Sequence, residues 1–139
     1  MLKAVIDTNI WISALLGIGN PKKIKDHLSQ EHYQAICSTE LVDELLDVLS
    51  RPKFAQKITD IDAADLVRLL KRAATFVQPE ELAQTSRDPK DDVFLACSIA
   101  AGADYLVTGD QDLLSLGEFQ GTKIVTAREF LQLLESSPD

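Results

Sequence analysis

Acidic and small polar residues follow apolar segments at several separated points of this sequence. The segment AVI is followed directly by Asp7, and Thr8 and Asn9 come next. An ionised carboxylate among apolar neighbours loses hydration worth several kcal/mol unless it finds a partner, a metal ion or a proton. Asp7 is therefore either a helix cap or a residue placed for chemistry.

Two further apolar segments end in polar residues. Ser38 follows the segment YQAIC, Thr108 and Asp110 lie at the end of YLVTGD, and Asp112 comes two residues later. Ligands of a parallel α/β sheet bind beyond the carboxyl ends of its strands. If these segments are parallel strands, their polar residues meet at one edge of the sheet.

Glu44 lies at the border of the apolar face of a predicted helix. The segment 40–49 repeats leucine at helical spacing, and projection at about 100° per residue places Glu44 beside Leu41 and Val48. The other acidic residues in the middle of this segment project away from the apolar face. Glu44 is therefore the carboxylate of this helix best able to reach inward.

The segment DDVFLACSIAAG predicts a buried helix, because it is apolar nearly all round and stops at a glycine. Asp92 projects on the same side as Ala96 and Ile99, whereas Asp91 lies nearer Ser98. We therefore expect Asp92 to face protein in the first turn of this helix.

Acidic residues from four distant parts of the chain would thus converge on one edge of a sheet. Taken singly, each is equally well explained as a partner of a helix dipole or as a turn residue. Together they repel one another, and a protein retains such a cluster mainly where a cation or a shared proton relieves the repulsion. Oxygen ligands favour a hard ion such as Mg²⁺ or Mn²⁺, which assists phosphodiester hydrolysis.

Short apolar segments that alternate with helical patterns predict the elements that position these residues. We expect an α/β domain, a three-layer α/β/α sandwich with a mainly parallel sheet of about five strands. A single domain over residues 1–135 and a frayed tail over 136–139 are predicted. The expected strands cover residues 2–6, 33–37, 74–77, 105–108 and 123–126.

Composition supports one domain with a sizeable core, because 45% of the 139 residues are hydrophobic. The sequence shows neither a signal-peptide pattern nor the ~20 apolar residues that cross a bilayer, which predicts a cytoplasmic protein without a membrane partner. The net charge of −8 argues against nucleic acid as a partner, but grouped basic residues leave local positive surface. These groups are Lys22, Lys23 and Lys25, then Arg51, Lys53 and Lys57, then Arg68, Lys71 and Arg72.

Cysteine and histidine contribute little to the predicted chemistry. Cys37 and Cys97 lie far apart in apolar segments, which favours two buried free thiols over a disulfide or a zinc site. His27 and His32 lie in a polar segment and are expected at the surface.

Four stretches of the chain resemble the PIN-domain ribonucleases, which include the VapC-type toxins of toxin-antitoxin pairs. They are VIDTNIWISALL, STELVDELLDVLSRPKF, RDPKDDVFLACSIAAGADYLVTGDQDLL and KIVTAREFL. They occur in the order of the family and cover most of the chain. The resemblance therefore implies a PIN-like nuclease domain.

The resemblance also implies roles for individual residues. It places the four acids of the family on Asp7, Glu44, Asp92 and Asp110, with Asp91 and Asp112 as adjacent competitors. It implies an endoribonuclease that cleaves single-stranded RNA. In this enzyme Asp7, Asp92 and Asp110 would hold Mg²⁺ or Mn²⁺, with Asp112 as the alternative to Asp110. Glu44 would hold or deprotonate the attacking water. Small polar residues that orient the acids or contact water would be Thr8, Asn9, Ser38 and Thr108.

The same resemblance implies partners, and two rival functions stand beside it. A small antitoxin covering the cleft and a homodimer are implied, with Trp11 and Phe54 in the interface or, as aromatic residues on helices more often are, in the core. One rival is a PIN-like module that binds RNA or protein without cutting. Another is a haloacid-dehalogenase-type phosphatase, whose second acid would stand where the chain has Asn9.

Overall fold

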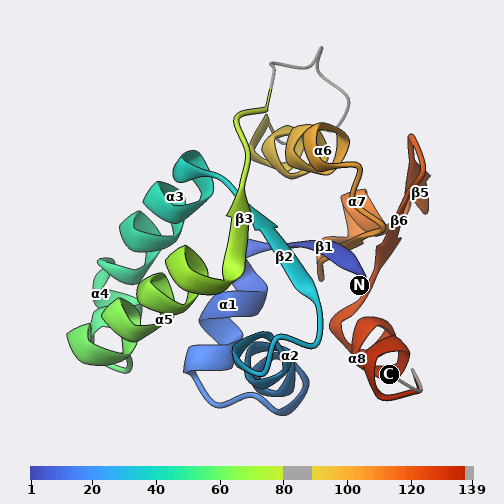
Figure 1. The fold of residues 1–139 in the computed structure, drawn as a ribbon. Helices are drawn as coiled ribbons and strands as arrows, with labels where there is room; N and C mark the ends of the chain where they lie inside the picture. The colour runs from blue at the N-terminus through green and yellow to red at the C-terminus, as the bar shows by residue number, and fades with distance from the viewer. Residues whose placement is uncertain (80–88, 137–139) are drawn as a thin grey trace.

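The computed structural model describes residues 1–79 and 89–136, which form an α/β fold around one mainly parallel sheet (Figure 1). Its strand order is β3-β2-β1-β4-β6-β5, and every neighbouring pair is parallel except β5 with β6. All five expected strands are present. The strands are β1 (Lys3–Ile6), β2 (Gln34–Cys37), β3 (Ala74–Phe76), β4 (Tyr105–Val107), β5 (Glu118–Phe119) and β6 (Thr122–Val125).

The sequence did not predict β5, because two residues are too few to show an alternating pattern. It pairs with β6 through a hairpin in which Phe119 opposes Thr122. The two intervening residues, Gln120 and Gly121, have φ of 48° and 91°. Two positive φ values characterise the tight type I′ turn that joins antiparallel strands.

Helices cover both faces of the sheet, as Figure 1 shows. Helix α2 was not predicted from the sequence, because its buried side consists of Pro21, Ile24 and Leu28 among mostly polar residues. The helices are α1 (Thr8–Leu15), α2 (Gly19–Ser29), α3 (Thr39–Leu49), α4 (Pro52–Ala55), α5 (Asp60–Ala73), α6 (Pro89–Ala101), α7 (Gln111–Leu114) and α8 (Ala127–Ser136).

Alternate residues of β1 pack into two separate cores. Ala4 and Ile6 belong to a core that includes residues of α1, α2, α5 and α8. Val5 belongs to a second core, on the side of α6. Because successive side chains of a strand point to opposite faces, the central strand is buried on both sides. The predicted three-layer α/β/α sandwich is confirmed.

Several expectations for single residues are also confirmed. Trp11 lies in the first core and is 4% exposed, and Phe54 packs against that core. Cys37 and Cys97 are buried free thiols. Burial raises the pKa of Cys37 to about 11, so that its reactive thiolate is scarce at neutral pH.

The tail predicted over residues 136–139 lies mostly outside the described residues. Helix α8 runs through Ser136, and residues 137–139 lie outside the described residues, as do 80–88. Within the described parts of the chain, no helix is long and apolar enough to cross a membrane.

Candidate active site

Three of the residues predicted for the site begin helices at the carboxyl edge of the sheet. Asp7 caps α1, where its Oδ1 accepts a hydrogen bond of 2.9 Å from the backbone N–H of Asn9. Ser38 caps α3 by accepting from the N–H of Leu41, and Asp110 caps α7. Each cap follows a parallel strand, so the three residues lie along one edge.

Capping accounts for only one oxygen of Asp7, and the other is bound by Thr108. The Thr108 hydroxyl donates to Asp7 Oδ2 across 2.7 Å. The same hydroxyl oxygen accepts a hydrogen bond of 3.0 Å from the backbone N–H of Asp110. Asp7 is 3% exposed and Thr108 is fully buried. Thr108 therefore connects the residues that follow β1 and β4.

The strand register explains why these residues meet. Ile6 pairs with Val107 in the parallel ladder of β1 and β4, and the N–H of Asp7 donates to the carbonyl of Val107 at 2.9 Å. Asp7 and Thr108, one position further along each strand, then stand side by side. Residues 101 positions apart in the sequence form this contact.

Two opposing effects act on the carboxyl group of Asp7. Burial raises its pKa, and the nearby charge of Asp110 raises it further. The hydrogen bonds from Thr108 and from the N–H of Asn9 lower the pKa, but they do not outweigh burial. Asp7 and Asp110 are therefore close enough to repel each other, as predicted for two members of an acidic cluster.

Asp110 and Asp112 have different positions. Asp110 is half-buried and acts electrostatically on Asp7, whereas Asp112 is exposed in the first turn of α7. The backbone N–H of Asp112 donates to the Asp110 carboxylate at 2.8 Å. This geometry favours Asp110 as the partner of Asp7 and gives Asp112 a part in orienting it.

Thr8 and Asn9 differ in how they relate to Asp7. Thr8 is 5% exposed in the first turn of α1. Asn9 is exposed, and its backbone N–H makes the contact with Asp7. This contact depends on the turn that begins α1, since any residue except proline at position 9 would supply the same donor.

Glu44 and its neighbours on α3 lie as their helical projection predicts. Glu44 is half-buried, and Asp43 and Asp47 are exposed. The first turns of α3 stand next to the carboxyl end of β2, because Ser38 caps this helix.

On α6 the structure differs from the projection. Asp91 is 4% exposed and shares the buried side with Leu95 and Ser98, whereas Asp92 is half-buried and Ile99 is 36% exposed. Asp92, expected to face protein, is thus half-buried, and the adjacent Asp91 is the more buried of the two acids. Because α6 is apolar nearly all round, its sequence does not reveal which side faces the sheet.

The four predicted acids are only partly brought together. Within residues 1–79 and 89–136, no three side chains among histidine, cysteine, aspartate and glutamate form a group that could hold a metal ion. The pair Asp7 and Asp110 fits Mg²⁺ by its chemistry, since this ion is often held by one or two carboxylates, water and substrate phosphate. Each carboxylate oxygen of Asp7 accepts a hydrogen bond and has a second lone pair.

A pocket of about 220 Å³ lies at the carboxyl ends of β2 and β3. Of its lining residues, Ser38 was predicted from the sequence as a site residue. Gln78 and Pro79 follow the third expected strand, over residues 74–77, and this position is the signal that could have found them. The lining comprises Ser38, Thr39, Glu40, Val77, Gln78 and Pro79.

Comparison with known proteins agrees with this fold. An uncharacterized protein of Methanocaldococcus jannaschii, MJ1680, is 26% identical, over 96% of this chain and 92% of its own length. A family model described as PIN domain matches residues 3–112, which include Asp7, Glu44, Asp92, Asp110 and Asp112. The chain belongs to the PIN domain family.

Proposed function

We propose that this protein is a Mg²⁺- or Mn²⁺-dependent endoribonuclease that hydrolyses single-stranded RNA. The PIN domain family includes nucleases, which supports a hydrolase in general. The observation that carries the proposal is the buried carboxylate of Asp7, held beside Asp110 at the carboxyl edge of a parallel sheet. The repulsion between these two carboxylates is relieved where a bound cation offsets their charge.

Hydrogen bonds from the chain prepare Asp7 for this role. Thr108 and the N–H of Asn9 each donate to one oxygen, so the carboxylate is fixed in orientation, and both bonds partly offset the effect of burial on its ionised form. The second lone pairs of both oxygens are then directed by the fold rather than by the substrate. Preorganised groups of this kind need no rearrangement during the reaction.

In the proposed reaction, Asp7 and Asp110 would hold the ion. Asp92 is added on the family resemblance alone, since these three side chains do not form one group in the part of the chain that the structure describes. When bound, Mg²⁺ or Mn²⁺ offsets the negative charge of the carboxylates and of the phosphodiester. Glu44 holds or deprotonates the attacking water. Water attacks the phosphorus in line with the ribose 3′ oxygen, which leaves with a proton, and the new end carries a 5′ phosphate.

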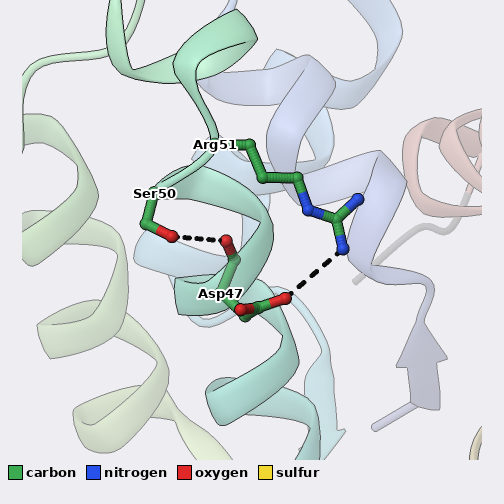
Figure 2. A network of polar contacts seen from close by, with 3 residues as sticks. All are labelled: Asp47, Ser50 and Arg51. Carbon is green, nitrogen blue, oxygen red and sulfur yellow. Dashed lines mark hydrogen bonds and ion pairs between the residues drawn. The ribbon is translucent and has the colours of Figure 1, made fainter.

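Basic residues bear on how RNA would lie on the surface. Arg51 at the end of α3 contacts Asp47 Oδ2 at 3.3 Å, and Ser50 donates to the Asp47 carbonyl (Figure 2). Exposed ion pairs of this kind contribute ~1 kcal/mol or less to stability. The guanidinium group of Arg51 can therefore leave Asp47 and bind a phosphate of the RNA. RNA held at both Asp7 and Arg51 would run along α3, which is ~16 Å long.

A second group of basic residues lies at the end of α5. Lys71 and Arg72 end α5 immediately before β3, which places them at the amino end of that strand. The candidate site lies at the opposite end of the parallel strands. Arg51 likewise follows the end of α3 that is remote from Ser38, so we assign it to RNA that runs along α3 from the candidate site.

A role as the toxin of a cytoplasmic toxin-antitoxin pair, with a small antitoxin partner and a homodimer, is a further part of the proposal and rests on the family resemblance. Co-purification with the product of a neighbouring short reading frame tests it. Loss of RNA cleavage on adding that product would support the role, and unchanged cleavage would contradict it.

The experiment that tests the nuclease function uses a mixed RNA pool with and without Mn²⁺. The proposal predicts discrete fragments with 5′ phosphate ends in Mn²⁺ and intact RNA in EDTA. A protein that binds the pool and leaves it intact in both conditions would be a non-catalytic module instead.

A further inference from the structure

His27 and His32 face each other at the opposite end of the sheet from the candidate active site. Their Nδ1 atoms are 2.8 Å apart, and their ring centroids are 5.0 Å apart. His32 lies two residues before β2 begins at Gln34, whereas Ser38 follows the end of that strand. The pair is therefore separate from the acidic residues at the carboxyl edge.

The backbone at the end of α2 fixes the two histidines in place. The N–H of His32 donates to the carbonyl of His27 at 2.9 Å, and the N–H of Glu31 donates to the carbonyl of Leu28 at 2.9 Å. Glu31 has a φ of 59°, in the left-handed region. These are the two hydrogen bonds and the left-handed residue of a Schellman motif, in which the side chains at the positions of His27 and His32 meet.

Buried neighbours anchor both histidines. Leu28, next to His27, is fully buried, and Tyr33, next to His32, is 1% exposed. The Tyr33 hydroxyl donates to the carbonyl of Ile24 in α2 at 3.1 Å. The paired positions of a Schellman motif usually hold apolar side chains. Here they hold two imidazoles, one half-buried and one exposed, on a rigid backbone.

We propose that His27 and His32 chelate one Cu²⁺ or Ni²⁺ ion through their two Nδ1 atoms. Imidazole nitrogen is a good ligand for both ions. With metal–nitrogen bonds of about 2.0 Å, an Nδ1–Nδ1 separation of 2.8 Å corresponds to an angle of about 90° at the metal. Adjacent positions of a tetragonal Cu²⁺ or Ni²⁺ site have this angle, whereas a tetrahedral Zn²⁺ site needs a separation of about 3.3 Å.

Binding would replace the hydrogen bond between the rings. In that bond one Nδ1 carries a proton and the other accepts it. On binding, both rings would be neutral with their proton on Nε2, and both would rotate to direct their Nδ1 lone pairs to the ion. Water would complete the coordination. The ion would link the end of α2 to the start of β2, and it would stabilise the fold because the unfolded chain lacks the paired geometry.

Titration of the full-length, tag-free protein with CuCl₂ or NiCl₂ alone tests this site by calorimetry. We expect one ion per chain in the parent and a loss of affinity of at least about tenfold in His27→Ala and in His32→Ala. Gln30→Ala, at an exposed position of the same turn, should bind as the parent does. Equal binding by the parent and both histidine variants would overturn the proposal, as would the absence of binding in the parent at millimolar metal.

Proton NMR provides a second readout that needs no variant. His27 and His32 are the two histidines of the chain, so two sets of imidazole signals are expected. Substoichiometric Cu²⁺ should broaden both sets together. Broadening of one set alone, or of neither, would show that the two rings do not share an ion.

Discussion

The Thr108 hydroxyl donates to Asp7 Oδ2 across 2.7 Å and accepts from the backbone N–H of Asp110. This one side chain thus holds the carboxylate that follows β1 and positions the acid that follows β4. Since both carboxylates are proposed to act together, the geometry of the site depends on a residue with no acidic group of its own.

Thr108→Val removes this hydroxyl and preserves the shape of the side chain. Hydrogen bonds to charged groups contribute about 1.5–3 kcal/mol, so the free energy of unfolding at neutral pH should fall by about that amount. The pKa of Asp7 should rise further, because Thr108 lowers it in the parent. Thr108→Ser retains the hydroxyl and is the control. Urea denaturation that gives equal stabilities for the valine and serine variants would contradict this role.

The buried carboxylate of Asp7 should make stability depend on pH. Because burial raises its pKa above the ordinary value of 3.8, the folded state binds a proton more tightly than the unfolded state does. The parent therefore loses stability relative to Asp7→Asn as pH rises from about 3.8 through the raised pKa of Asp7. Urea denaturation of both proteins in EDTA measures the difference. A difference that is constant with pH, or that changes in favour of the parent as pH rises, would contradict the assignment.

A divalent ion should reverse this destabilisation at neutral pH. Mn²⁺ at 100 times its dissociation constant would add about 2.7 kcal/mol of stability and raise the melting temperature. The shift should be largely lost in Asp110→Asn and retained in Asp112→Asn, since Asp110 acts on Asp7 and Asp112 is exposed. Equal shifts in the two variants would contradict the assignment of Asp110, rather than Asp112, as the partner of Asp7.

Arg51 should contribute to RNA affinity through its charge alone. Arg51→Ala should weaken binding of a single-stranded RNA and lower the slope of log affinity against log salt by about one. Asp47→Ala, which removes the partner of Arg51, should leave the slope at least as steep as in the parent. Fluorescence anisotropy over a salt series measures both. An unchanged slope in Arg51→Ala would place the RNA elsewhere.

Much of the fold could be predicted, because its strands appear in the sequence as short apolar segments and most of its helices show helical spacing of apolar residues. Asp7, Ser38 and Asp110 were predicted at the sheet edge because each follows an apolar strand. The bond between Asp7 and Thr108 could not be predicted, since it depends on the register of Ile6 with Val107. The buried side of α6 could not be predicted correctly, because that helix has apolar residues on every side.

Cleavage of RNA by site variants tests the central claim most directly. A metal ion supplies several kcal/mol of transition-state stabilisation, so Asp7→Asn and Asp92→Asn, confirmed as folded, should cleave RNA about a thousandfold more slowly than the parent in Mn²⁺. Asp43→Asn changes an exposed acid of α3 by the same charge and should retain the rate of the parent. The account predicts this contrast in the rate at which 5′-phosphorylated fragments appear, and parental rates in Asp7→Asn and Asp92→Asn would contradict it.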